Sequence, residues 1–254
     1  MTNQLWGPFQ PLPKCRLWLS EDRTGSNAGE PERPREFAEA HLCNQDLERW
    51  NRYRPSEKKR QFLNSRLAVR AVLLREFGTD SDNFRVETME TGQPILKHAH
   101  QHPLPSISLS HTGNITAVVV SDSHQRIGVD IEIVNSLKVR PLGLTLLNQF
   151  EHDWLTKEVL AESPEMMLAI WTLKEALWKA LGGPRDTAIS DIVAEYNNST
   201  LNGQKWTNKK GKQSAATHFF GHQLSFPFVL TNYSSIDDLN SQTPSFIGCI
   251  ALMD

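Results

Sequence analysis

Apolar and polar positions alternate strictly over residues 127–134, IGVDIEIV, which is typical of a β-strand. Isoleucine or valine takes every second position, whereas Gly128, Asp130 and Glu132 share the opposite face. Side chains two positions apart on a strand lie roughly 6–7 Å from each other, so the two carboxylates repel across that face. Two interpretations follow: the acidic face lies in solvent, or a positive group lies between the acids.

The same periodicities predict the other elements of the chain. Helices are expected from about Gln45 to Gly78, over 144–163, and from an N-cap at Ser163 to the glycines that follow Leu181. The polar stretch 197–216 is expected to be a loop. Strands or hairpins are predicted at CRLWLS (15–20), VETMETGQPIL (86–96), ISLSHTGNITAVVVS (107–121), HQLSFPFVL (222–230) and FIGCIALM (246–253).

Each of the two clearest helices carries an apolar stripe that predicts its buried face. The stripes are Leu63, Leu67, Ala71, Leu74 and Phe77 in the first, and Met166, Ile170, Leu173, Leu177 and Leu181 in the second.

The order of elements repeats along the chain. Each half runs a basic amphipathic helix, hairpin material, a strand with Leu-Ser (SLSH, QLSF) and an apolar strand of small residues (TAVVVS, GCIALM). The repeat predicts an α+β fold of two similar α/β halves, residues 1–124 and 125–254. Chance repetition is the alternative, because α+β domains reuse the same elements.

Composition narrows the classes of function. The 254 residues are 39% hydrophobic and 22% charged, and a net charge of −2 gives no general attraction to nucleic acid or an anionic membrane. The three cysteines form no Cys-x-x-Cys pair, so neither a disulfide framework nor a thiolate zinc site is indicated. The N-terminus lacks a signal-peptide pattern, and no apolar run approaches the ~18 residues that span a bilayer. We expect a soluble, cytoplasmic protein that binds neither membrane nor nucleic acid.

The acidic strand is interpreted together with the helix predicted over 164–183. Glu175 and Lys179 lie four residues apart on that helix, which alone would indicate an ordinary surface ion pair. Taken together, Asp130, Glu132 and Glu175 offer three oxygen ligands to Mg²⁺, which leaves roughly three positions for water and substrate phosphate. Lys179 would offset charge on the same phosphates. A divalent cation would thus make the acidic face tolerable.

At this point the chain resembles the 4′-phosphopantetheinyl transferases. GVDIE (128–132) and WTLKEALWK (171–179) are similar to the paired acidic signatures of that family. SLSHTG (108–113), RQFLNSRLAVRAVL (60–73) and CRLWLS (15–20) are similar to its Ser-His motif, arginine helix and opening strand. The order agrees from about residue 14 to the C-terminus. The length resembles the two-lobed, surfactin-synthetase-activating type, which implies a monomer of two halves related by a pseudo-twofold axis, with the active site in the cleft between them.

The resemblance implies an activity and a metal. The family transfers the 4′-phosphopantetheine arm of coenzyme A to a serine hydroxyl of an apo acyl or peptidyl carrier protein, and releases adenosine 3′,5′-bisphosphate. Its Mg²⁺, for which Mn²⁺ is expected to substitute, implies Asp130, Glu132 and Glu175 as ligands here. Asp130 and Lys179 are implied in catalysis with Glu175, which is also the candidate acceptor of the serine proton, directly or through a metal-bound water.

The resemblance also implies contacts with coenzyme A. His111 and Ser110 match its Ser-His motif, with His111 toward the 3′-phosphate, and Arg60 and Arg66 are candidates for the same phosphate. Lys179 and Lys174 are further phosphate candidates, and a structural salt bridge is the alternative for Lys174. Gln93 stands in the TGQP turn where many members have a lysine, so it brings a hydrogen bond and no charge.

Two other interpretations stay open at this stage. A divalent-metal phosphoesterase or nuclease also gathers carboxylates around Mg²⁺, although it usually needs a second acidic cluster for a second metal. A non-catalytic module that binds carrier proteins is the other. The sequence leaves the carrier undetermined among fatty-acid, polyketide and nonribosomal-peptide proteins, as well as the acceptance of acylated coenzyme A.

Overall fold

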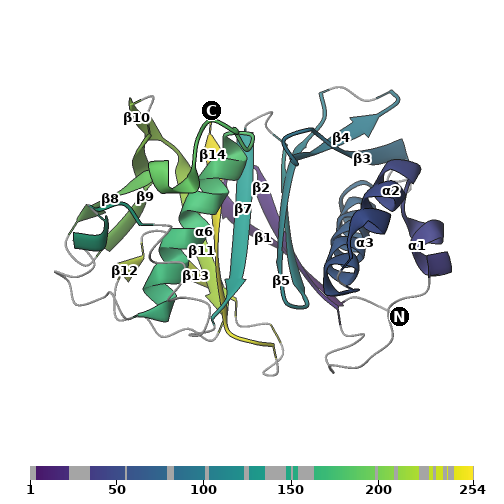
Figure 1. Ribbon diagram of the computed structural model, residues 1–254, viewed down its shortest axis with the longest axis horizontal. Coiled ribbons are helices and arrows are strands. Elements are labelled where there is room, and N and C mark those ends of the chain that lie inside the picture. Colours follow the sequence, from purple (N-terminus) through teal and green to yellow (C-terminus); the bar gives the residue numbers. More distant parts are fainter. Residues whose placement is uncertain are drawn as a thin grey trace.

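Two four-stranded sheets lie in the middle of the molecule, with helices at one end and a third four-stranded sheet at the other (Figure 1). The computed structural model describes residues 4–22, 35–54, 56–78, 83–100, 103–122, 126–134, 147–149, 151–153, 163–197, 200–208, 211–222, 229–230, 233–236, 239 and 243–253. No helix within these ranges is both long and apolar enough to cross a membrane.

The first sheet is antiparallel, in the order β1-β2-β6-β5. Its strands are β1 (Gln4–Leu12), β2 (Cys15–Glu21), β5 (Ser106–Thr112) and β6 (Ile115–Ser121). The first part of the chain adds helices α1 (Arg35–His41), α2 (Asn44–Arg52) and α3 (Ser56–Phe77), and the hairpin of β3 (Phe84–Thr88) and β4 (Pro94–His98). All seven residues of β6 are buried because α3 covers one face of this sheet and the second sheet covers the other.

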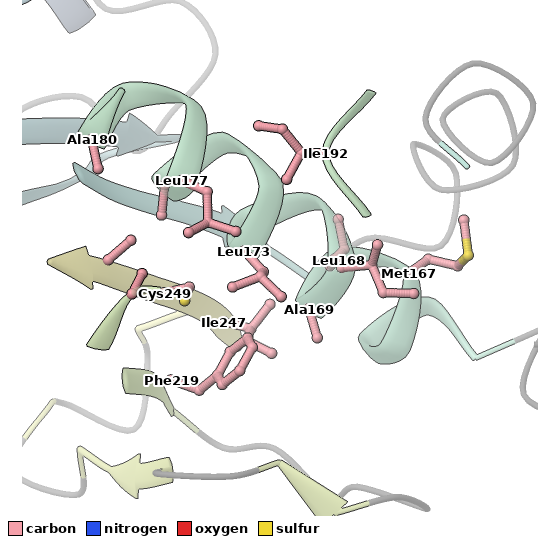
Figure 2. Close-up of a cluster of buried hydrophobic side chains, with 14 of the residues drawn as sticks. Met167, Leu168, Ala169, Leu173, Leu177, Ala180, Ile192, Phe219, Ile247 and Cys249 are labelled. Carbon is pink, nitrogen blue, oxygen red and sulfur yellow. The ribbon is translucent and has the colours of Figure 1, made fainter. Parts of the chain in front are cut away.

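The second sheet has the order β13-β11-β14-β7 and is covered by helix α6. Its strands are β7 (Arg126–Ile133), β11 (Ala216–His222), β13 (Tyr233–Ser235) and β14 (Phe246–Met253). The remaining elements are α6 (Pro164–Ala180), the 3₁₀ turn Ile189–Asp191, β8 (Val193–Asn197), β9 (Thr200–Asn208), β10 (Gly211–Ser214) and β12 (Val229–Leu230). Figure 2 shows apolar side chains of α6, such as Leu173 and Leu177, against Phe219 and the β14 residues Ile247 and Cys249.

The two main sheets pack face to face, and their contact is the core that joins the halves. Leu17, Ala117 and Val119 of the first sheet belong to one buried cluster with Val129 and Ile131 of β7. This is the apolar face predicted for the strand IGVDIEIV. The opposite face of β7, which carries Asp130, therefore lies toward α6 rather than in bulk solvent.

The two halves repeat one strand order, which confirms the prediction of an α+β fold of two similar parts. In the first sheet β6 lies between β2 and β5, and in the second β14 lies between β7 and β11. The matching groups of three strands are β2-β6-β5 and β7-β14-β11. In each group the chain forms the first strand (β2 or β7), then a long helix (α3 or α6), and then the other two strands. The strand in the position of SLSH is β11 (Ala216–His222), and QLSF (223–226), its predicted counterpart, lies outside the described residues.

Helix boundaries follow the local signals. Ser163 caps α6 by accepting a hydrogen bond from the Met166 amide at 3.3 Å, and Gly182 follows the helix with φ +89°. Gly78 ends α3 with φ +58°. Leu74 of the predicted α3 stripe is 57% exposed, whereas Val72 and Leu73 beside it are buried.

Three other predictions differ from the structure or fall outside it. The polar stretch 197–216 was wrongly expected to be a loop: β9 and β10 pair as an antiparallel hairpin there, because a backbone ladder does not require apolar alternation. Strand β1 was missed, since its prolines argue against a strand, yet it forms a sheet edge, where proline is tolerated. The helix expected over 144–163 lies largely outside the described residues.

Gly128 lets α6 rest directly on β7. A methyl group at this position would lie 1.9 Å from the Ala176 carbonyl oxygen and 2.7 Å from the Ala180 amide nitrogen. Both atoms are helix backbone, so neither can turn aside. We expect Gly128→Ala to lower the free energy of unfolding by more than about 3 kcal/mol, at the upper end of overpacking costs, as measured by urea denaturation.

Gly78→Ala is the matched control, because a methyl group there meets nothing within 4 Å. Its φ of +58° should cost roughly 1–2 kcal/mol by backbone strain alone. Equal urea midpoints for the two variants would contradict the close contact of α6 with β7.

Candidate active site

Hydroxyl side chains on one face of β5 connect the edges of the two sheets. β5 ends the first sheet and β7 ends the second. The Ser108 hydroxyl oxygen accepts the Val129 amide hydrogen at 3.0 Å, and the Thr112 hydroxyl oxygen accepts that of Ile133 at 3.2 Å. We call Ser108, Ser110 and Thr112 the hydroxyl seam. The hydroxyl seam takes the place of the backbone hydrogen bonds that would otherwise join β5 and β7.

The seam also holds the two acids of β7. Ser110 donates to Asp130 Oδ1 at 2.7 Å, and Thr112 donates to Glu132 Oε2 at 3.1 Å. The two acids that were predicted to share a face thus each bind a hydroxyl group of the other half. Ser110, predicted as a coenzyme A contact, is buried and faces Asp130.

Lys179 is the positive group beside the acidic strand. Its ammonium donates to Asp130 Oδ1 at 2.7 Å, to the Val129 carbonyl at 3.1 Å and to Ser110 Oγ at 3.2 Å. It also lies 3.9 Å from Glu175 Oε2, one helical turn earlier on α6. Of the two interpretations of the acidic face, the structure agrees with the second for Asp130: a lysine from α6 offsets its charge.

Glu175 is the acid of this site whose pKa is raised. Burial raises its pKa, and the charges of Asp130 and Glu132 raise it further, while the nearby Lys179 ammonium opposes the shift. Mutual repulsion of this kind requires the three carboxylates to lie near one another. Lys179 contacts both Asp130 and Glu175, so these two acids lie in one region, where β7 contacts α6.

The carboxylate oxygens of this site are of the kind that a hard cation binds. Within the described ranges, no three His, Cys, Asp or Glu side chains converge into a ready metal site. Asp130 Oδ2 is nevertheless buried and has no hydrogen-bond partner among the described residues, and Glu175 is crowded by two like charges. Unpartnered carboxylate oxygens are the ligands that Mg²⁺ prefers, so the residues fit this ion, with Lys179 as the cation they now face.

A pocket of about 280 Å³ opens beside these groups. Both halves line it. The lining residues are Arg49, Tyr53, Phe62, Ser65 and Arg66 from α2, α3 and the link between them, Thr91–Pro94 of the hairpin, Ser108, Leu109 and His111 of β5, and Trp178, Lys179 and Gly183 from α6 and the residues after it. Positive and aromatic groups from one half thus face Lys179 from the other, in the cleft where the resemblance implied an active site.

Two predicted coenzyme A contacts, His111 and Gln93, line this pocket. His111 keeps exposed surface there, although desolvation by the surrounding protein lowers the pKa of its ring and Lys179 lowers it further. The ring is therefore mostly neutral near pH 7. Gln93 lies in the hairpin turn at the pocket rim, and its Oε1 is near Gly182, which follows α6.

The three other predicted contacts are placed differently. Arg66 lines the pocket but is engaged, since it binds both oxygens of Asp46 at 2.7 and 3.0 Å. Arg60 lies on α3, is half-buried and is not among the residues that line the pocket. Lys174 is completely buried and bonds to Glu151 at 2.5 Å, which favours its structural alternative. The helix turns Lys174 away from the pocket that Lys179 enters.

Several residues of the site were not predicted from the sequence. Arg49, Tyr53 and Phe62 line the pocket from α2, α3 and the link between them, where only Arg60 and Arg66 were predicted as ligand contacts. Ser108 and Thr112 flank the predicted Ser110 at spacing two, which places all three on one strand face. That spacing was the available signal for the seam.

Comparison with known proteins finds one family that is similar to the C-terminal part of this chain. The family model of the 4′-phosphopantetheinyl transferase superfamily matches residues 126–231, which include the acidic strand and α6. Over this segment the chain is similar to the 4′-phosphopantetheinyl transferase superfamily. Its match therefore covers Asp130, Glu132, Glu175 and Lys179.

Relatives in the 4′-phosphopantetheinyl transferase superfamily are distant. The Synechocystis sp. protein slr0495, whose name places it in the same family, is 26% identical over 190 residues, 73% of this chain and 72% of that protein. The Nostoc sp. 4′-phosphopantetheinyl transferase HetI is 26% identical over 60% of this chain and 65% of its own. The Bacillus subtilis transferase Sfp is 27% identical over 53% of this chain and 58% of its own. The last two alignments span less than two thirds of the relatives' length.

Proposed function

We propose that this protein transfers the 4′-phosphopantetheine moiety of coenzyme A to a serine hydroxyl of an apo carrier protein. The observation that supports this most is the position of Lys179, which lines a pocket built by both halves and contacts the carboxylates of Asp130 and Glu175. One chain supplies both walls, so a monomer would suffice. Coenzyme A and carrier proteins meet in the cytoplasm, where we expect the enzyme to act.

The pocket suits a phosphate-bearing ligand with an aromatic base. Lys179 reaches the pocket from α6, and its flexible side chain can turn from Asp130 toward phosphate oxygens. Arg49 lies among the lining residues and near the Phe62 ring, with 5.8 Å between its guanidinium carbon and the ring centroid. His111, neutral at pH 7, would bind phosphate by donating a ring N–H. Gln93 adds a neutral hydrogen-bonding group where many family members carry a lysine.

In the proposed reaction one bond to phosphorus forms and one breaks. The carrier serine oxygen forms a bond to the β-phosphorus of coenzyme A, while the bond from that phosphorus to the bridging oxygen breaks. Adenosine 3′,5′-bisphosphate leaves with that oxygen. Mg²⁺, held by Asp130, Glu132 and Glu175, would supply charge neutralisation at the pyrophosphate when bound. Lys179 donates hydrogen bonds to the same developing charge.

Glu175 is the residue that we assign to the serine proton. Its raised pKa makes its carboxylate a better proton acceptor than an ordinary glutamate, because that pKa lies closer to neutral pH. Glu175 also serves as a metal ligand in this proposal, so one of its oxygens would serve each purpose. The carboxylate of Glu175 would accept the proton directly or through a water molecule.

The direct test is transfer to a panel of apo carrier proteins. Fatty-acid, polyketide and nonribosomal-peptide carriers are incubated with the protein, coenzyme A and Mg²⁺, and then read by intact mass. We expect at least one carrier to gain the mass of one phosphopantetheine, and only when divalent metal is present. A carrier whose acceptor serine is replaced by alanine is the control, and it should gain nothing.

Other outcomes would favour other functions. Failure of every carrier would overturn the proposal. Cleavage of DNA or of a simple phosphodiester in parallel reactions would instead support a phosphoesterase or nuclease. Carrier binding without any gain in mass would support a non-catalytic module. The panel also decides the carrier class and, with acylated coenzyme A added, the tolerance for acyl groups.

A further inference from the structure

The hydroxyl seam fixes the direction in which two hydroxyl hydrogens point. Thr112 Oγ1 accepts the amide hydrogen of Ile133, so one lone pair is directed at the β7 backbone. Its hydrogen is then free to point at Glu132 Oε2, at 3.1 Å. Thr112 is 5% exposed, so water does not compete strongly for that hydrogen. A backbone group of β7 thereby sets the orientation of a hydroxyl that binds a carboxylate of the same strand.

Ser110 repeats this arrangement two residues earlier. Its oxygen accepts from the Lys179 ammonium and its hydrogen is donated to Asp130 Oδ1. Each acid of β7 therefore has one oxygen bound to the seam. For Asp130 the second oxygen, Oδ2, is buried without a partner among the described residues. The seam leaves one ligand oxygen of Asp130 available.

We infer that Thr112 is a positioning residue for the metal ligand Glu132, across the boundary between the two halves. Groups that bind the far oxygen of a ligating carboxylate fix its rotamer and strengthen metal binding. Thr112 comes from the half that holds the pocket's arginines, and Glu132 from the half that holds α6. The inference rests on the proposed function only through the metal site. It predicts that the geometry of the metal ligands depends on the alignment of the two halves.

A purely structural role for Thr112 is the alternative, and Ser108 separates the two. Ser108 also accepts an amide hydrogen of β7, from Val129, and is similarly buried. Its hydroxyl has no carboxylate among its described hydrogen-bond partners. Ser108→Ala and Thr112→Val each leave one buried β7 amide without its acceptor, so their effects on stability should be similar. Only Thr112→Val also removes a donor from Glu132.

The experiment measures Mn²⁺ binding to the full chain by electron paramagnetic resonance, without coenzyme A or carrier. We expect Thr112→Val to raise the Kd for Mn²⁺ by about tenfold or more, as is usual when a partner of a metal ligand is lost. Thr112→Ser keeps the hydroxyl group and should restore most of the affinity. Ser108→Ala removes no donor from a carboxylate and should raise the Kd far less than Thr112→Val does. Asp130→Asn marks the site, since its loss should abolish this binding.

Each outcome decides between the two ideas. Equal Kd values for the parent and Thr112→Val, or an equal rise for Ser108→Ala, would overturn the positioning role even if transfer to carriers is observed. Absence of Mn²⁺ binding by the parent would also overturn it. A selective loss in Thr112→Val, together with no transfer to any carrier, would support the seam and reject the transferase. Thermal melts of all variants exclude a loss of folding as the cause.

Discussion

Asp130→Asn is expected to reduce transfer by several orders of magnitude while the metal-free protein melts within about 2 °C of the parent. The amide keeps the size of the side chain and an oxygen for the Ser110 hydroxyl. It removes the negative charge from the one carboxylate with a buried, unpartnered oxygen in the described site. Transfer is measured by carrier mass at limiting Mg²⁺, and stability by thermal melting.

The small effect on melting has a physical reason. The substitution weakens the contact of Asp130 with Lys179, but that ammonium keeps Ser110 and the Val129 carbonyl as acceptors. The lost ion pair is offset by relief of the repulsion between Asp130 and Glu175. The parent should melt higher when Mg²⁺ and coenzyme A are added together, whereas the variant should lose most of that rise. Part of its turnover should return with Mn²⁺, which binds such ligands more tightly.

Asp122→Asn is the matched control for a paired aspartate outside the site. Asp122 binds Arg16 through both oxygens and its side chain is 51% exposed. We expect its turnover and its response to Mg²⁺ to equal those of the parent. Parental turnover of Asp130→Asn at limiting Mg²⁺ would contradict the role of the acidic strand.

The sequence predicted those parts of the fold whose signals are local. Strict alternation identified β7 and the side of it that enters the core, and a serine cap with a double glycine delimited α6. The polar hairpin of β9 and β10 was missed because its pairing depends on backbone hydrogen bonds, which polar residues make as readily as apolar ones. Strand β1 was missed because only its place at a sheet edge makes its prolines acceptable.

The candidate site was predictable in its carboxylates and less so in its surroundings. Spacing identified Glu175 and Lys179 as neighbours on a helix face, which the ion pair at 3.9 Å agrees with. The same helical spacing gave no means to tell Lys174, whose rotation about the axis buries it against Glu151, from Lys179. The bond of Thr112 to Glu132 joins two halves of the chain, and such contacts depend on how the sheets pack. Local sequence carries little information about that.

Glu175→Gln should reduce transfer further than Asp130→Asn and recover less with Mn²⁺. It would remove a metal ligand and the acceptor of the serine proton in one step. The double variant should be little worse than Glu175→Gln alone, because both acids act through one ion. Turnover of the two single variants and the double variant, measured on one carrier over a range of Mg²⁺ and Mn²⁺ concentrations, checks both statements.

The metal-free stability of Glu175→Gln should move in the opposite direction to its activity. The pKa of Glu175 is raised above its ordinary value of 4.5, so the folded protein holds this proton more tightly than the unfolded chain does. The stability that this group contributes is present at low pH and is lost as the pH rises through the folded pKa. At neutral pH its charge therefore opposes folding, and Glu175→Gln should melt higher than the parent without metal. The difference should shrink as the pH is lowered.

The same shift predicts the acid limb of the pH profile. Glu175 binds metal and accepts a proton only when it is ionised, so transfer should decline on the acid side at a higher pH than an ordinary glutamate would give. Saturating Mg²⁺ should move this limb to lower pH, because a bound cation favours the carboxylate. Glu57→Gln, an exposed acid in the first turn of α3, is the control and should change neither the limb nor the metal-free melting curve. If Glu175→Gln melts lower than the parent at neutral pH without metal, its charge is compensated in the folded state, and its assignment as the proton acceptor loses its physical basis.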